Sequence, residues 1–229
     1  MLQMDFSFFN VGSIRGFTSN FVAICSATSH SFGFPSRSKR SPLDILKYLV
    51  TILRNQNKKV EFIRVDEDGA LTISSEFMMT FHNMNIMVQT TAGYTSSING
   101  KSESPNKKLA NITRALLLNS SHKKELWCFA YQYAIWFSWQ TDNKLHGGVP
   151  YFLWNGTRPS YKNIKIWGVR VYIINGRATR KKIDDISHLG YFMRYAATTG
   201  VILYWKPDQP FIIHRDHHVW LMNIILASP

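Results

Sequence analysis

Strand-like and helix-like segments alternate along the first half of this 229-residue sequence, and that order strongly limits the folds open to it. Two strand-like segments, 5–10 and 16–24, come first, and a Gly/Pro/Ser-rich loop at 30–41 follows them. After the loop the patterns read helix, strand, helix, strand, helix, over residues 42–59, 60–66, 74–84, 85–91 and 103–119. Ser41 is placed to cap the first of these helices, with Pro42 at its first position. The alternation predicts an α/β fold, in which helices cover a central sheet.

The longest apolar run, residues 126–139, predicts a further buried helix. It is shorter than the roughly 20 residues that span a bilayer, and Gln132 and Ser138 interrupt it. The first ten residues lack the basic start of a signal peptide. Cys25 and Cys128 are too few for a disulfide framework, which favours a reducing compartment. We therefore expect no membrane partner.

The pattern changes near residue 160, where helical periods give way to short β-rich segments. These segments, 164–174, 187–196, 200–206 and 210–220, are separated by turn signals such as Asn-Gly and Lys-Pro-Asp. Four or five short strands in this length predict a small all-β barrel. We expect an α/β domain over residues 1–120, a helical extension or linker over 121–160 and a β domain over 161–229.

Basic residues outnumber acidic ones by 27 to 14, for a net charge of +13, which predicts a polyanionic partner. Residues 1–159 carry +7 and residues 160–229 carry +6, so the charge density is about twice as high in the second part. Such side chains bind phosphates with little sequence selectivity. Their alternative role is that of solvated loop residues. The candidate nucleic-acid-binding residues are Lys101, Lys107, Lys108, Arg177, Arg180, Lys181 and Lys182.

Three of the few acids occupy informative positions: Asp5 in the first strand, Asp66 at the end of a buried strand and Glu103 at the entry of a helix. Brought together, they would form an all-oxygen site of the kind that suits Mg²⁺ or Mn²⁺. The alternative is that Asp66 and Glu103 are acidic for local reasons, one beside a turn and one at a helix start. His214, His217 and His218 do not predict a zinc site, because adjacent strand residues face opposite sides and no cysteine is near.

Spacing and flanking motifs connect these acids to a known family. Sixty residues lie between Asp5 and Asp66, and 36 lie between Asp66 and Glu103. Residues 94–112 carry an Asn-Gly-x-x-Glu-x-x-Asn motif, residues 149–173 a Pro-Tyr-x-x-Trp-x-Gly-x-x-Pro stretch leading to Trp-Gly-x-x-x-Tyr, and residues 189–220 a Gly-Tyr-Phe opening with a late His-Arg-Asp. In these blocks the sequence resembles the integrase part of copia-type LTR retrotransposon Pol polyproteins.

The resemblance implies a ribonuclease H-like core followed by an SH3-like barrel, with Asp5, Asp66 and Glu103 as catalytic and metal-binding residues for Mg²⁺ or Mn²⁺. It further implies DNA integration by strand transfer, DNA as partner, a homo-oligomer when active and a nuclear location. Because Asp5 lies four residues from the start, we expect a first strand shortened at its upstream end, which puts activity in question. A catalytically inactive, transposon-derived nucleic-acid-binding protein is therefore the alternative, and a ribonuclease H-type hydrolase is a third possibility.

Overall fold

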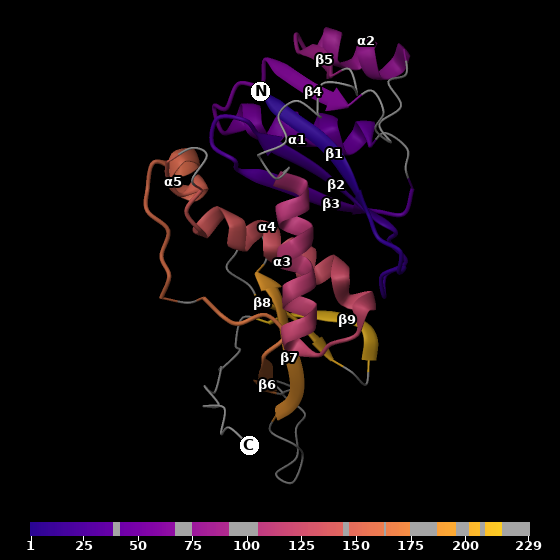
Figure 1. Cartoon of the computed structure of the whole chain (residues 1–229), viewed down its shortest axis with the longest axis vertical. Helices are drawn as coiled ribbons and strands as arrows, with labels where there is room; N and C mark the ends of the chain where they lie inside the picture. The colour runs from indigo at the N-terminus through magenta and orange to yellow at the C-terminus, as the bar shows by residue number, and fades with distance from the viewer. Residues whose placement is uncertain are drawn as a thin grey trace.

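The computed structural model describes residues 1–38, 42–66, 75–91, 105–143, 147–162, 164–174, 187–195, 202–206 and 209–216. Its upper part in Figure 1 is a five-stranded sheet in the order β3-β2-β1-β4-β5. The strands are β1 (Leu2–Phe8), β2 (Ser19–Cys25), β3 (Ser31–Ser36), β4 (Phe62–Asp66) and β5 (Met87–Thr91). β1, β2 and β3 pair in antiparallel fashion, whereas β4 and β5 run parallel to β1. The predicted α/β core is therefore confirmed.

Helices cover both faces of this sheet because its strands are apolar on both sides. Met4, Phe21 and Ile63 face α1 (Leu43–Asn55) and α2 (Ser75–Asn83) in one buried cluster. Val22 and Ile24 face the other way, into a second cluster with α3 (Pro105–Ser120) and α4 (Trp127–Gln140). A 3₁₀ turn, η2 (Lys124–Leu126), precedes α4, and α5 (Pro150–Asn155) follows it. The run predicted as a buried helix is thus α4. No helix in the described residues is long and apolar enough to cross a membrane.

Several predicted boundaries were wrong for physical reasons. Part of the segment predicted as a loop at 30–41 is the edge strand β3, in which Phe32 and Phe34 pair with β2, and an edge strand tolerates Gly33 and Pro35. β1 begins at Leu2, so Asp5 is the fourth of its seven residues, all of which pair with β2. Pro42 is the N-cap residue of α1 rather than its first helical residue, and Ser41 lies outside the described residues.

The C-terminal part contains a second sheet, drawn in orange to yellow in the lower half of Figure 1. Its strands are β6 (Arg170–Ile174), β7 (Ser187–Tyr195), β8 (Ile202–Lys206) and β9 (Gln209–Asp216), joined as an antiparallel meander. Phe192 and Met193 of β7 enter the same buried cluster as α4. The predicted short strands are present, but among the described residues β6 and β9 are the edges of an open sheet. Closure into the predicted SH3-like barrel is therefore not confirmed.

Candidate functional site

Asp5 lies at the centre of β1, on the face of the sheet that carries α3 and α4. Leu2, Met4 and Phe6 alternate with it along the strand and are buried on the opposite face, against α1 and α2. The side chain of Asp5 is exposed. β1 and β4 pair in the register Met4↔Val65, so Asp5 and Asp66 are the next positions along two neighbouring parallel strands. Residues 61 positions apart in sequence are thus brought side by side at the backbone level.

Both carboxylate oxygens of Asp5 accept hydrogen bonds. The backbone N–H of Phe6 donates to Oδ1 at 2.7 Å, and Nδ2 of Asn106 donates to Oδ2 at 2.9 Å. Asn106 is the second residue of α3, so this bond holds the start of that helix against β1. Each carboxylate oxygen still has a lone pair free for a cation, since a carboxylate offers about four acceptor sites. Asp5 is thus oriented without being neutralised.

Asn106 is itself held by two hydroxyl groups. Tyr131 Oη donates to Asn106 Oδ1 at 2.6 Å, and Ser7 Oγ donates to the same oxygen. Tyr131 is fully buried on α4, and burial raises the pKa of its hydroxyl well above the ordinary value. Asn106 was not among the predicted site residues. It is the final Asn of the Asn-Gly-x-x-Glu-x-x-Asn motif, and its place in that motif could have identified it.

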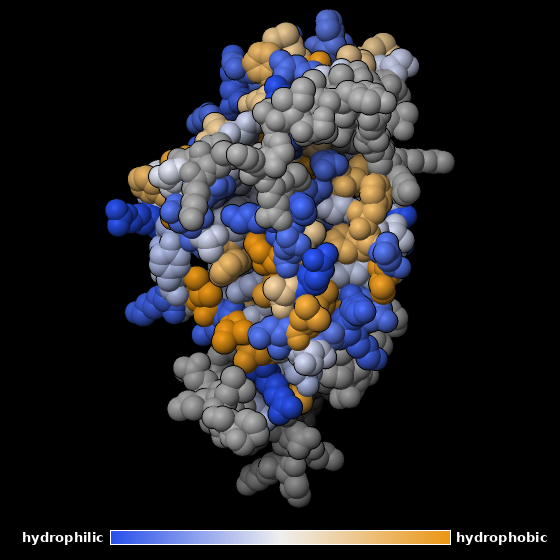
Figure 2. All heavy atoms as spheres, in the orientation of Figure 1, coloured by the Kyte–Doolittle hydropathy of each residue, from blue (hydrophilic) through white to orange (hydrophobic). Residues whose placement is uncertain are grey.

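The other predicted site residues are only partly described. Lys107 and Lys108 follow Asn106 on α3, and both are exposed. In Figure 2 hydrophilic side chains dominate the upper part of α3, and apolar ones appear toward its lower end. The remaining predicted residues, Lys101, Glu103, Arg177, Arg180, Lys181 and Lys182, lie outside the described residues. Within the described part of the chain, no three His, Cys, Asp or Glu residues form a group that could hold a metal ion.

The groups around Asp5 fit a hard divalent cation in their chemistry. Carboxylate oxygens are the ligands that Mg²⁺ and Mn²⁺ prefer, and Asp66 is the next residue in register. The neighbouring donor, the Asn106 amide, is neutral and adds no positive charge that would repel a cation. No basic side chain forms an ion pair with Asp5 among the described residues, where the salt bridge found is that between Lys59 and Glu61.

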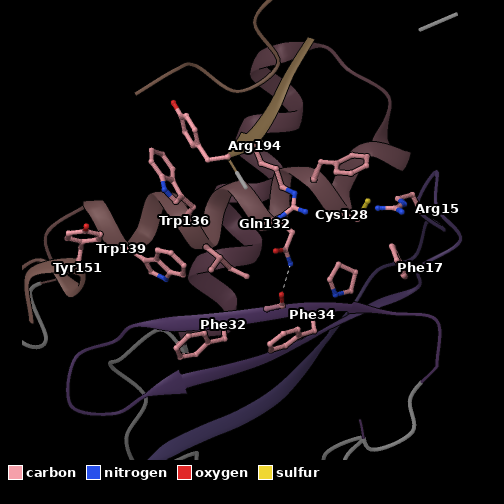
Figure 3. Close-up of a pocket in the computed structure, with 15 residues that line it drawn as sticks. Arg15, Phe17, Phe32, Phe34, Cys128, Gln132, Trp136, Trp139, Tyr151 and Arg194 are labelled. Carbon is pink, nitrogen blue, oxygen red and sulfur yellow. Dashed lines mark hydrogen bonds between the residues drawn. The ribbon is translucent and has the colours of Figure 1, made fainter. Parts of the chain in front are cut away.

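A separate pocket of about 550 Å³ lies between β3 and α4 (Figure 3). Phe32, Phe34, Trp136 and Trp139 line it together with Arg15 and Arg194, and none of the Asp5 network is among its lining residues. Gln132 Nε2 donates across it to the Gly33 carbonyl at 2.8 Å, drawn as a dashed line in Figure 3. Burial raises the pKa of the Cys128 thiol on its wall to about 11, which makes this cysteine a poor nucleophile.

Beside this pocket, His30 is enclosed by two tryptophans. Its ring stacks at 4.3 Å on Trp139 of α4 and at 4.6 Å on Trp154 of α5, measured between centroids. Lys58 Nζ donates to the Trp154 carbonyl at 2.7 Å. Nδ1 of His30 has no hydrogen-bond partner among the described residues. Burial, with a smaller contribution from the Lys58 charge, lowers the pKa of His30 from 6.5 to about 3.

This His30 environment predicts a loss of stability in mild acid. The unfolded chain binds a proton at His30 below about pH 6.5, whereas the folded chain does so only near pH 3, so acid favours unfolding in between. Between about pH 6.5 and pH 4 the free energy of unfolding should fall by about 3 kcal/mol because of His30. Urea unfolding followed by tryptophan fluorescence measures this. His30→Phe keeps a flat ring between the tryptophans, and in this variant that part of the acid sensitivity should disappear; identical pH profiles would contradict the assignment.

In comparisons with known proteins, no protein-family model matches the chain. In sequence the chain is similar to a polyprotein of transposable elements. Over 172 residues it is 26% identical to the retrovirus-related Pol polyprotein from transposon TNT 1-94 of Nicotiana tabacum, a match that covers 74% of this chain and 13% of that polyprotein. The predicted resemblance to a retrotransposon Pol polyprotein is confirmed.

Solved structures of integrases are also similar to the chain. The catalytic core domain of BIV integrase matches with 15% identity and a TM-score of 0.45, over 66% of this chain and 91% of that one. The HTLV-2 integrase catalytic core in complex with magnesium, in a trimeric form, matches with 16% identity and a TM-score of 0.45, over 66% and 92%. A simian T-cell lymphotropic virus intasome in complex with PP2A regulatory subunit B56 gamma matches with 14% identity and a TM-score of 0.48, over 94% and 80%.

Proposed function

We propose that this chain is a retrotransposon-derived integrase that joins DNA by metal-dependent strand transfer. One observation carries the proposal: Asp5 and Asp66 are adjacent positions on parallel strands, and the helix that follows Glu103 begins against Asp5 through the Asn106 hydrogen bond. The integrase-type resemblance to a Pol polyprotein supports it. The α/β part is then a ribonuclease H-like core over residues 1–120. Residues 121–160 are the helical extension, and 161–229 are an SH3-like domain.

In this proposal Asp5, Asp66 and Glu103 hold Mg²⁺ or Mn²⁺. When bound, such ions activate a terminal DNA hydroxyl or water and stabilise the leaving oxygen of a phosphodiester. The protein's own groups orient the ligands: the Phe6 N–H and the Asn106 amide set the rotation of the Asp5 carboxylate. Lys107 and Lys108 extend from the turn of α3 that contains Asn106, where they contact DNA phosphates. Lys101 and the basic run at 177–182 add further phosphate contacts. DNA, a homo-oligomeric assembly and a nuclear location belong to the same proposal.

Removing the metal tests the proposed reaction directly. With a labelled DNA end and a target duplex, we expect strand-transfer product in Mg²⁺ or Mn²⁺, no product in EDTA, and recovery when the metal is restored. An RNA/DNA hybrid offered in parallel separates an integrase from a ribonuclease H-type hydrolase. Product formation in EDTA would contradict the metal requirement. Faster cleavage of the hybrid than of duplex DNA would favour the hydrolase.

A second candidate function is nucleic-acid binding without catalysis. It is favoured by the net charge of +13 and by the exposed Lys107 and Lys108. Because phosphate contacts release counterions, such binding weakens steeply as salt rises, and it does not depend on carboxylates. Salt-sensitive DNA binding without any metal-dependent product would favour this candidate over the integrase.

A further inference from the structure

We propose that the hydroxyl group of Tyr131 is a positioning group for the Asp5 carboxylate, acting through Asn106. Tyr131 does not contact Asp5 in any described hydrogen bond. It sets the orientation of the amide that does. The importance of Asp5 rests on the proposed function, whereas the orientation of the Asn106 amide can be measured independently of it.

The orientation of Asn106 follows from the hydrogen-bonding capacity of its neighbours. Its carbonyl oxygen has two lone pairs, and the hydroxyls of Tyr131 and Ser7 both donate to that oxygen. Its NH₂ group is thereby turned toward Asp5 and donates to Oδ2 at 2.9 Å. A flipped amide would place a carbonyl oxygen against a carboxylate oxygen, and two acceptors repel each other. The two hydroxyls and the carboxylate therefore select the same orientation.

The hydroxyl of Tyr131 is a fixed reference point because its ring is fully buried and packs against an aromatic neighbour. Tyr131 is 0% exposed on α4, and its ring packs edge-on against Phe9, with 5.6 Å between centroids. Phe9 in turn stacks at 3.8 Å on Trp127, whose Nε1 donates to the carbonyl of Val11 at 2.8 Å. These contacts join α4 to the segment that leaves β1. Helix packing thus fixes the hydroxyl, and the hydroxyl fixes Asn106.

The chemical advantage of this arrangement is that every orienting group is neutral. A lysine or arginine in place of Asn106 would also donate to Asp5, but its charge would oppose a divalent cation at the same carboxylate. The amide leaves Asp5 anionic, and the buried tyrosine keeps its proton because desolvation disfavours the phenolate. Hydrogen bonds of this kind around a metal ligand typically affect metal affinity by about 10- to 100-fold.

Tyr131→Phe removes the hydroxyl and keeps the ring, and Tyr133→Phe is the matched control. Tyr133 is two residues further along α4 and is 3% exposed, and its hydroxyl donates at 2.6 Å to the carbonyl of Lys165, outside the Asp5 network. Tyr133→Phe deletes one hydrogen bond, and Tyr131→Phe deletes the bond to Asn106 together with the 3.0 Å contact to Ser7 Oγ, so both variants should be less stable than wild type. Only Tyr131→Phe should change the Asn106 amide and the carboxylate site.

Three measurements decide between positioning and a merely structural role. Hydrogen exchange of the Asn106 side-chain amide, followed by NMR without metal, should accelerate about tenfold in Tyr131→Phe and stay unchanged in Tyr133→Phe. The Mn²⁺ dissociation constant, measured by titration, should rise about tenfold in Tyr131→Phe alone. In strand transfer at saturating metal, kcat should fall while KM for DNA stays constant.

The outcomes separate this inference from the proposed function. Equal amide exchange in wild type and Tyr131→Phe, or equal shifts in both variants, would overturn the positioning role. If the wild-type chain binds no Mn²⁺ and forms no product, the proposed function fails, and amide exchange alone then decides whether Tyr131 orients Asn106. Faster exchange with an unchanged Mn²⁺ affinity would overturn the link from Asn106 to the carboxylate.

Discussion

Asp66→Asn and Asp5→Asn are each expected to lower the rate of Mg²⁺-dependent strand transfer by about 1,000-fold. Each change replaces an anionic oxygen by an amide NH₂, which cannot ligate a divalent cation, and the loss of such charge stabilisation corresponds to about 4 kcal/mol of activation free energy. At Asp5 the new NH₂ would also face a donor in either orientation, the Phe6 N–H or Nδ2 of Asn106. Single-turnover product formation, with protein in excess over DNA, measures the rate.

The matched control for these two variants is Asp44→Asn, the same change of acid to amide at an exposed position in the first turn of α1. α1 covers the sheet face opposite Asp5, so the strand-transfer rate of Asp44→Asn should stay at the wild-type value. DNA affinity at fixed salt should change little in all three variants, because phosphate binding depends on basic residues. Wild-type rates in Asp66→Asn would disprove the catalytic assignment. Retained DNA binding together with an inactive wild type would support the nucleic-acid-binding alternative.

Gly33→Ala is expected to lower the free energy of unfolding by about 1 to 2 kcal/mol, within the range for overpacking. A Cβ atom at Gly33 would lie 2.1 Å from Ile135 Cδ1 and 3.0 Å from Asn20 Nδ2, both closer than atoms in van der Waals contact. Ile135 lines the pocket between β3 and α4, so its Cδ1 atom can rotate partly away at the cost of its present packing. The displacement would also disturb the Gln132 hydrogen bond to the Gly33 carbonyl. Denaturant unfolding gives the free-energy difference.

A double-mutant cycle identifies the cause of this loss. Ile135→Val removes the Cδ1 atom and should by itself cost about 1 kcal/mol. The double variant Gly33→Ala/Ile135→Val should then lose less unfolding free energy than the two single variants together, because the new Cβ atom no longer meets Cδ1. Gly12→Ala is the control, since nothing lies within 4 Å of a Cβ atom there. If the losses of unfolding free energy in the two single variants simply add in the double variant, contact between residue 33 of β3 and Ile135 of α4 is not the cause of the lower stability.

The same region shows why local patterns failed at β3. Phe32 and Phe34 alternate as strand residues do, but Gly33 and Pro35 lie between and beside them and together read as a loop. Whether a strand can contain such residues depends on its position in the sheet. β3 is an edge strand, and on its open side α4 supplies donors to the carbonyls of Ser31 and Gly33, from Trp139 at 2.9 Å and Gln132 at 2.8 Å. That protection comes from residues about 100 positions away, which no local pattern contains.

Asp5 and Asp66 were selected from the sequence as candidate ligands, and that role stays a prediction. Residue types and spacing were enough to select the two acids but not to place them relative to each other. The register that makes them adjacent comes from strand pairing between β1 and β4. Asn106 was part of a recognised motif, but its hydrogen bond to Asp5 spans 101 positions and its amide orientation depends on Tyr131, a further 25 positions along the chain.

By itself, the sequence determined the α/β class of the first half, with helices over a central sheet, the basic character of the chain and its resemblance to a retrotransposon Pol polyprotein. These properties are local, since hydrophobic periodicity and residue spacing act over a few turns or along a single motif. Only the tertiary structure decided that 31–36 is an edge strand, that Asp5 lies next to Asp66 and that Tyr131, Ser7 and Asn106 orient its carboxylate. Each of these depends on contacts between segments far apart in the chain, whose geometry is set by packing.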